Sequence, residues 1–232
     1  MRLLALLPVV GAFVAAVQPA AAQSPALDLA ALVSHTDTFA FRINGQAFGT
    51  QVMSLERTDS GFVFSETSTL PNAQQTTSVS LDPDLRIRSV RQDGQAGGQQ
   101  MYIDVRVADG RATGRARVPG SAGMEDRDID AALPDGAIDD NVLMAILPAL
   151  PWQDGAEFAL AIFASGRNQV SPYTFRVTGT EDVTLPGGTF KAFRVEVEGT
   201  QPLVIHVAQD GPHRLLRLQV AGTPLELVRT GG

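Results

Sequence analysis

Three histidines are the first candidates for chemistry, because imidazole transfers protons near neutral pH and is the commonest metal ligand. They are His35, His206 and His213. His206 lies between Ile205 and Val207 in an alternating run, so it falls on the polar face of the expected strand. No third ligand stands at a spacing typical of a metal site. The pattern therefore predicts surface or cross-strand histidines and no bound metal.

Carboxylates at alternate positions open the most acidic stretch, Asp126-Arg127-Asp128-Ile129-Asp130. Such a pattern begins a calcium-binding loop, which also needs Gly at its sixth position and a bidentate Glu at its twelfth. Ala131 and Ala137 stand at those two positions. Ala131 therefore replaces the Gly that allows the loop to turn sharply, and Ala137 replaces the Glu that would bind the ion. The stretch is therefore interpreted as a solvated acidic loop.

The sequence offers no recognisable nucleophile. It contains no cysteine, and Gly120-Ser121-Ala122-Gly123 lacks the Gly-x-Ser-x-Gly spacing of hydrolases. Gly187-Gly188 lacks the flanking residues of a phosphate-binding loop and indicates a turn. Glu196 and Glu198 share one face of a strand with Arg194, which is typical of a cross-strand charge ladder. We therefore predict that the protein is not an enzyme and holds no cofactor.

Alternation of apolar and polar residues organises most of the chain into strands. In the run from Thr189 to Gly199, Phe193, Val195 and Val197 take one face, while charged residues take the other. Asn44-Gly45 is a favoured two-residue hairpin turn between two such runs. The same pattern recurs to the C-terminus, so the sheet is expected to be antiparallel.

We predict a mainly β (β-rich α+β) fold. It is a strongly curved antiparallel sheet or half-barrel of about ten to thirteen strands that encloses one short buried helix. A closed barrel and two stacked sheets are the alternatives, because curvature depends on bulges and strand tilt. No internal linker marks a boundary, so residues 23–232 are expected to form a single domain.

One helix is expected, from about Asp139 to Leu147. Asp139 is a suitable N-cap, and acidic residues at that end favour the helix dipole. Every residue from 142 to 147 is apolar, so this helix should be buried on all sides. Pro148 and Pro151 are expected to end it, just before Trp152, which is the single tryptophan.

The first 22 residues have the pattern of a secretory signal peptide. Arg2 is followed by the apolar run Leu3 to Val17, and Ala20 to Ala22 form a small-residue cleavage site. Cleavage after Ala22 predicts a periplasmic protein of 210 residues (232 minus 22) with no membrane span. Without Arg2, 17 basic residues face 25 acidic ones, a net charge of −8. This charge excludes nucleic acid as a partner, because binding it requires a basic surface.

The stretch from Gly179 to Phe190 carries a resemblance to a known kind of protein. It follows the pattern Gly-x-Glu-x-Val-x-Leu-Pro-Ala-Gly-x-Phe, with Gly187 in place of Ala. Together with the Phe41 to Gly49 hairpin and the helix before Trp152, it resembles uncharacterised bacterial periplasmic proteins made of a domain of unknown function. This resemblance implies a curved sheet around a helix, as in periplasmic lipoprotein carriers, and supplies no catalytic residues. The matching residues are Gly179, Glu181, Val183, Leu185, Pro186, Gly188 and Phe190.

An apolar helix opposite a strand of small residues suggests a site for an apolar ligand. A gap between the two would form a pocket, whereas a tightly closed sheet would make the same side chains plain core. The candidate ligand-binding residues are Leu143, Ile146, Leu147 and Trp152 near the helix, and Ala112, Gly114 and Ala116 on the strand.

Two functions follow from this reading. The first is an exported carrier or binder whose partner is a lipid or another apolar small molecule. The alternative is a non-catalytic structural or interaction module of the cell envelope, with an envelope protein as its partner. An exposed apolar or edge-strand surface without an enclosed cavity would favour the alternative.

Overall fold

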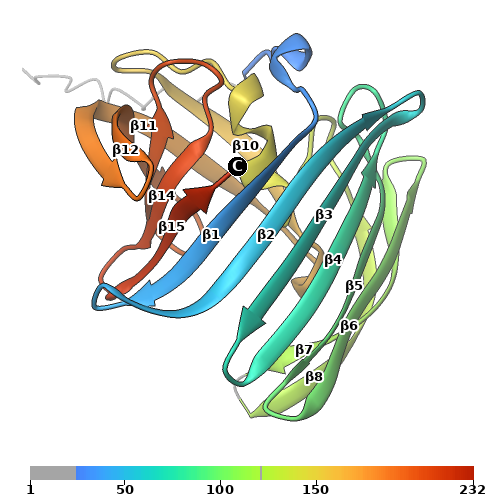
Figure 1. The fold of residues 1–232 in the computed structure, drawn as a ribbon. Helices are drawn as coiled ribbons and strands as arrows, with labels where there is room; N and C mark the ends of the chain where they lie inside the picture. Colours follow the sequence, from blue (N-terminus) through green and yellow to red (C-terminus); the bar gives the residue numbers. More distant parts are fainter. Residues whose placement is uncertain (1–24, 121) are drawn as a thin grey trace, which may run out of the picture.

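A computed structural model describes residues 25–120 and 122–232. The predicted signal peptide, residues 1–22, lies outside the described residues. Fifteen strands and three short 3₁₀ helices make up the described part (Figure 1). The helices are η1 (Leu29–Ala31), η2 (Leu143–Ala149) and η3 (Ser165–Arg167). The strands are β1 (His35–Ile43), β2 (Gln46–Thr58), β3 (Gly61–Leu70), β4 (Ala73–Leu81), β5 (Ile87–Ala96), β6 (Gln99–Ala108), β7 (Arg111–Gly120), β8 (Gly123–Ala132), β9 (Ile138–Asp139), β10 (Glu157–Ala164), β11 (Gln169–Leu185), β12 (Gly188–Glu198), β13 (Leu203–Ala208), β14 (Leu215–Val220) and β15 (Leu225–Gly231).

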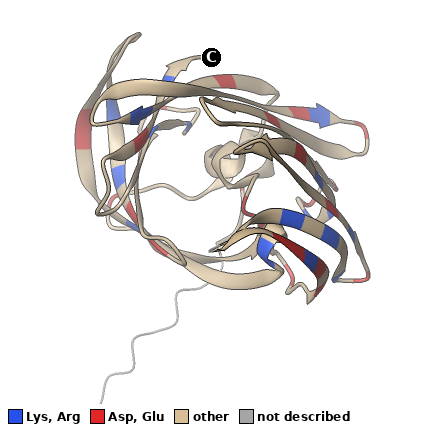
Figure 2. Cartoon of the chain, turned by 90° about the horizontal axis from the view of Figure 1, so that it is seen from below, with Lys and Arg blue, Asp and Glu red and all other residues tan. Residues whose placement is uncertain are grey.

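All fifteen strands belong to one sheet, in the order β8-β7-β6-β5-β4-β3-β2-β1-β15-β14-β13-β12-β11-β10-β9. Two meanders, β1–β8 and β9–β15, are joined where the first strand pairs with the last. Among the pairings of the described strands, only that of β9 with β10 is parallel. The edges β8 and β9 are neighbours in the chain but do not pair, so the sheet curls round without closing (Figure 2). The predicted curved antiparallel half-barrel is confirmed, with more strands than expected.

The acidic stretch is a strand and not the predicted solvated loop. It forms β8, in which Ile129 is buried and the carboxylates lie on the outer face. Arg115 and Arg117 of β7 stand opposite Asp128 and Asp126, and Arg111 lies diagonally across from Asp130. Three ion pairs result: Arg111–Asp130, Arg115–Asp128 and Arg117–Asp126. Figure 2 shows these alternating basic and acidic segments side by side. Cross-strand charge pairing of this kind suits an exposed sheet face, which composition alone did not reveal.

The buried helix is shorter and tighter than predicted. It is the 3₁₀ helix η2, which begins at Leu143 and contains Pro148 instead of ending before it. Asp139 does not cap it, because Asp139 lies in β9 and pairs with Phe163 of β10. Val142 precedes the helix without a side-chain cap, and its carbonyl oxygen accepts from the Ala145 N–H at 2.9 Å.

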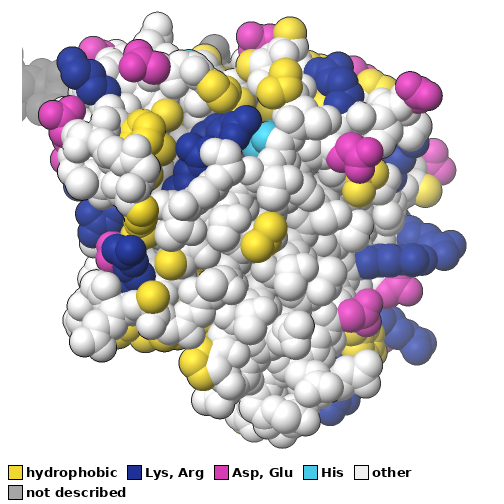
Figure 3. All heavy atoms as spheres, in the orientation of Figure 1, with side chains coloured by type: hydrophobic (Ala, Val, Ile, Leu, Met, Phe, Trp, Pro, Cys, Tyr) yellow, Lys and Arg dark blue, Asp and Glu magenta, His cyan; other side chains and the backbone are white. Residues whose placement is uncertain are grey.

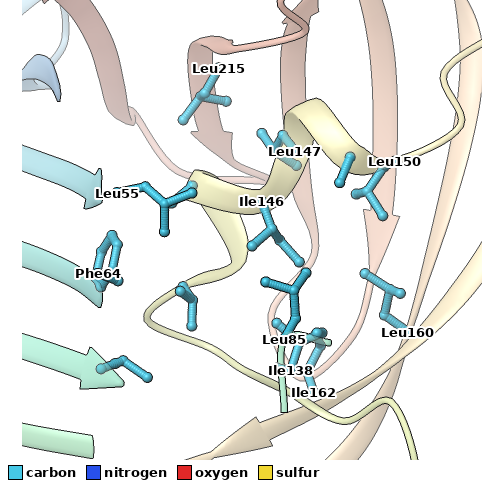
Figure 4. Close-up of a cluster of buried hydrophobic side chains, with 14 of the residues drawn as sticks. Leu55, Phe64, Leu85, Ile138, Ile146, Leu147, Leu150, Leu160, Ile162 and Leu215 are labelled. Carbon is cyan, nitrogen blue, oxygen red and sulfur yellow. The ribbon is translucent and has the colours of Figure 1, made fainter. Parts of the chain in front are cut away.

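The region around η2 is the main core. Ile146 and Leu147 point into a cluster of aliphatic side chains that come from both meanders (Figure 4). Trp152 follows, and its Nε1 donates to the Leu147 carbonyl oxygen at 2.7 Å. Its ring packs edge-on against Phe158 and Phe175, with centroids 5.4 and 6.4 Å away. Residues 145–149 of η2 are buried as predicted, whereas Leu143 and Met144 are only partly buried, so the helix is not covered on all sides.

A second, smaller apolar cluster lies apart from the main core. It contains Val183, Leu185, Ala192, Leu216 and Val228. Its residues come from the far part of the long β11–β12 hairpin and from β14 and β15, whose opposite faces carry core residues of the barrel. A register shift at Val177/Gly179 breaks the regular pairing of β11 with β12. Figure 1 shows these two strands curling at the side of the barrel beside β14 and β15.

No helix in the described residues has the length and hydropathy needed to cross a lipid bilayer.

Candidate ligand-binding site

An apolar cavity of about 310 Å³ lies inside the barrel. It is near the end where the turns β1–β2, β3–β4 and β14–β15 gather, which we call the hairpin end. Its lining comes from six strands and from η2: Phe41, Gln51, Glu66, Ser68, Leu70, Ala73, Gln75, Met144, Leu218, Val220, Leu225, Glu226 and Leu227.

Regular pairing brings the apolar part of this lining together. Phe41 of β1 stands opposite Leu227 of β15, which in turn stands opposite Leu218 of β14. Because side chains alternate along a strand, Leu225 and Leu227 project to the same side of the sheet. Met144 projects from η2 and forms the wall toward the main core. The cavity is thus the part of the barrel interior that η2 does not fill.

Polar side chains line the opposite wall, on β2, β3 and β4. Gln51, Glu66 and Ser68 are 4, 6 and 6% exposed, and all three line the cavity. Ser68 Oγ donates to Glu66 Oε1 at 2.8 Å, and Gln75 Nε2 donates to the same oxygen at 3.3 Å. Among the described residues, no hydrogen bond reaches Glu66 Oε2 or the Gln51 amide. Both groups belong to side chains that line the cavity, so they are available to a ligand or to water there.

A second inward row continues the polar wall away from the cavity. Glu66 stands opposite Thr77, and Thr77 stands opposite Gln92. Thr77 is completely buried, Gln92 is 6% exposed, and Thr77 Oγ1 donates to Gln92 Oε1 at 3.3 Å. The inner face of β3 to β5 therefore carries a row of polar side chains (Glu66, Thr77 and Gln92), whereas the side chains around η2 are apolar.

The seven predicted ligand-binding residues lie elsewhere. None of them lines this cavity, to which η2 contributes Met144 instead. Ile146, Leu147, Ala112 and Ala116 are buried in the main core, and Trp152 packs there with 8% exposure. Leu143 packs against the same core and is partly buried.

A close approach of two strands explains why position 114 is a glycine. A Cβ at this position would lie 2.0 Å from the Asp104 carbonyl oxygen of the neighbouring strand β6. Strands β6 and β7 approach so closely here that only glycine fits. Its small size therefore admits a neighbouring backbone. Gly114 also lines a polar surface hollow with Tyr102 and Arg115, separate from the hairpin-end cavity.

Sequence reasoning missed the polar wall, although a signal was present. Phe62 and Phe64 share the inward face of β3, and the same alternation places Glu66 and Ser68 on that face. Two polar residues continuing an inward apolar series predict either a polar cluster or a cavity.

A comparison with protein families gives a match over residues 38–222, to the family described as protein of unknown function (DUF3108). The match covers well over half of the chain. The chain belongs to the DUF3108 family. Most of the cavity lining lies inside the matched range, whereas Leu225, Glu226 and Leu227 follow it. No curated protein matches this DUF3108 sequence.

Solved structures with a similar fold include a beta-barrel-like protein of domain of unknown function DUF1849 from Brucella abortus. That protein is 10% identical to the DUF3108 chain, with a TM-score of 0.50, and the match covers 87% of this chain and 96% of that one. A putative exported protein with YmcC-like fold from Bacteroides fragilis is 12% identical, with a TM-score of 0.30 and coverage of 90 and 97%. A putative lipoprotein from Parabacteroides distasonis is also 12% identical, with a TM-score of 0.29 and coverage of 92 and 98%. The first of these supports the barrel-like fold.

The motif that carries the sequence resemblance is distant from the cavity in this DUF3108 protein. Gly179 lies at the register shift of β11, and Val183 and Leu185 belong to the second apolar cluster. Glu181 contacts His206 of β13, whose Nε2 and the Glu181 carboxylate form a short hydrogen bond. Burial lowers the pKa of His206, against the opposite effect of Glu181. The motif thus attaches the long hairpin to the barrel and does not supply the ligand site.

The other histidines also have structural partners. His35 Nδ1 lies 2.9 Å from the Val33 carbonyl oxygen, and His213 Nδ1 lies 2.9 Å from that of Ala208. Within residues 25–120 and 122–232, no three metal-ligating side chains form a group that could hold an ion.

Proposed function

We propose that this protein binds an apolar small molecule in the hairpin-end cavity and that its role is binding, not catalysis. The observation that carries the proposal is the composition of the cavity wall. One side is apolar, and the other holds two buried polar side chains, Gln51 and Glu66, with unused hydrogen-bonding capacity. A concave apolar site with a few convergent polar groups is the usual form of a small-molecule site.

The size of the cavity limits the ligand. A volume of 310 Å³ is near the lower end of the range for ligand pockets, roughly 300–1,000 Å³. It has room for roughly ten water-sized groups at about 30 Å³ each. A short alkyl chain, or the end of a longer one, fits this space. We prefer this cavity to the pocket predicted between η2 and β7, because five of the seven residues predicted there pack in the main core: Ile146, Leu147, Trp152, Ala112 and Ala116.

Uptake of the neutral fluorophore N-phenyl-1-naphthylamine tests the proposal. The wild-type protein should increase the emission of this probe in a saturable way. Ala73→Phe fills the cavity and should weaken binding about tenfold or more, a loss of about 1.4 kcal/mol. Ala47→Phe is the matched control, because Ala47 is exposed on β2 and does not line the cavity.

Equal binding by Ala73→Phe and the wild type would place the probe elsewhere on the molecule. Absence of any saturable uptake would contradict the binding function. It would favour the alternative, a non-catalytic structural or interaction module of the cell envelope.

We also propose that the protein is exported to the periplasm and cleaved after Ala22. The charged start and the apolar run of residues 1–22 support this location. N-terminal sequencing of the periplasmic fraction should begin at Gln23 or within a residue or two. Recovery of the intact Met1 form in the membrane fraction would contradict it.

A further inference from the structure

The hairpin-end cavity holds a carboxylate that forms no ion pair with any of the described residues. Glu66 is 6% exposed, and its hydrogen-bond partners among the described residues are the neutral side chains of Ser68 and Gln75. Glu226 also lines the cavity, but its carboxylate forms an ion pair of 2.6 Å with Arg217. Glu66 therefore dominates the electrostatic character of the polar wall.

We infer that the ligand has an apolar body and a head group that donates hydrogen bonds and carries no negative charge, such as an alkyl alcohol or an alkylammonium. The inference rests on the proposed binding function and adds the chemistry of the head group.

The reason is the hydrogen-bonding capacity of the two polar residues. An ionised carboxylate only accepts hydrogen bonds, and Glu66 Oε2 has none within the described part of the chain. A hydroxyl or ammonium head group supplies the missing donor, and hydrogen bonds between ionised groups are about twice as strong as neutral ones. Gln51 lies across from Ser68 on the neighbouring strand, and its amide both donates and accepts. A head group between Gln51 and Glu66 can therefore satisfy both residues.

The same geometry disfavours fatty acids. A ligand carboxylate beside Glu66 would place two negative charges in a site of low polarity, where their repulsion is much greater than in water. The apolar wall formed by Leu218, Leu225 and Leu227 offers no compensating cation. An anionic head group is therefore the one that this cavity should reject.

Three ligands of one chain length test the inference: octylammonium, 1-octanol and octanoate. Binding is followed by the methyl signal of Met144, which lines the cavity, with the partly exposed Met124 as an internal reference. In the wild type, octylammonium and 1-octanol should bind at least about tenfold more tightly than octanoate. Glu66→Gln keeps the shape of the side chain and should reduce the difference between octylammonium and octanoate about tenfold.

Glu56→Gln is the matched control, since it removes an exposed charge from β2 away from the cavity and should leave the ranking unchanged. Equal affinity of the three ligands for the wild type would overturn the inference and leave the binding function in place. An unchanged ranking in Glu66→Gln would also overturn it. If no ligand shifts the Met144 signal, the binding function itself fails. Thermal unfolding shows whether the Glu66→Gln variant is folded. If this variant does not fold, the ranking of the three ligands in the wild type still decides the inference.

Discussion

The region around η2 and the hairpin-end cavity lie inside the same sheet and are built in opposite ways. Strand β3 contributes to both: Phe64 packs in the cluster around Ile146 (Figure 4), while Glu66 and Ser68, two and four residues later, line the cavity. The strand is regular throughout, with alternating inward and outward residues. What differs is the chemistry of the inward side chains. The face a residue takes is therefore set by alternation, and whether that face is core or cavity is set by residue type.

The outer surface shows a comparable contrast. The middle of the face over β2 to β4 shows few charged side chains, whereas basic and acidic side chains lie around it along the top and both edges of the view (Figure 3). The edge strand β8 and its neighbour β7 account for three exposed ion pairs on the outside of the sheet. Charges placed along an edge strand discourage its pairing with an edge strand of another chain.

The largest effect should come from making the same substitution in both regions. Leu147 is 1% exposed in the main core, so Leu147→Ala should lower the free energy of unfolding by about 2–5 kcal/mol. Leu70 already borders the cavity and is half-buried, so Leu70→Ala should cost about 1 kcal/mol or less. Denaturant unfolding of both variants measures the difference. Similar losses would show that the cavity wall is as tightly packed as the core.

The strands were largely predictable because alternation is local. The inward series of β3 and the Asn44-Gly45 turn are visible in a few consecutive residues. Strand β8 was missed because its carboxylates find their arginine partners only after β7 and β8 pair. The pairing of β1 with β15 joins residues almost two hundred positions apart, and no local pattern specifies it.

The site was less predictable than the fold. An apolar helix and small residues indicated a pocket, but the structure packs both in the core. The cavity depends on how far η2 reaches into the barrel, and that reach is set by many contacts at once. Only the polar residues Glu66 and Ser68 on an inward face give a local signal of it.

A smaller effect, and one that depends on pH, should come from a buried carboxylate outside the cavity. Asp139 is completely buried in β9; Asn141 donates to its Oδ1, and among the described residues no hydrogen bond reaches its Oδ2. Burial raises the pKa of Asp139 to about 6. Because the folded state holds this proton more tightly than the unfolded state, stability falls as the pH rises from about 4 to 6. Below the pKa of the unfolded state, Asp139 is protonated in both states and does not lower stability.

Asp139→Asn removes the contribution of Asp139 to that dependence while keeping an acceptor for Asn141. Relative to the wild type, the variant should gain on the order of 1–3 kcal/mol between pH 4 and pH 7. Denaturant unfolding at several pH values measures the gain. Parallel stability curves for the two proteins would show that Asp139 does not titrate in this range. The result also sharpens the contrast with Glu66, whose Oε2 is free to meet a ligand or water at the cavity.

The last comparison exchanges a hydroxyl and a methyl group on one strand, and Thr77→Val should have one of the smallest effects. Thr77 and Val79 of β4 are both completely buried and both face inward, two residues apart. Thr77→Val loses one hydrogen bond of 3.3 Å to Gln92 in the polar row, which should cost about 1 kcal/mol or less. Val79→Thr puts a hydroxyl into the apolar core and should cost about 1–3 kcal/mol. The two substitutions change volume very little, so packing does not obscure the comparison. If Val79→Thr is tolerated as well as Thr77→Val, the boundary between the core and the polar wall does not lie between these two residues.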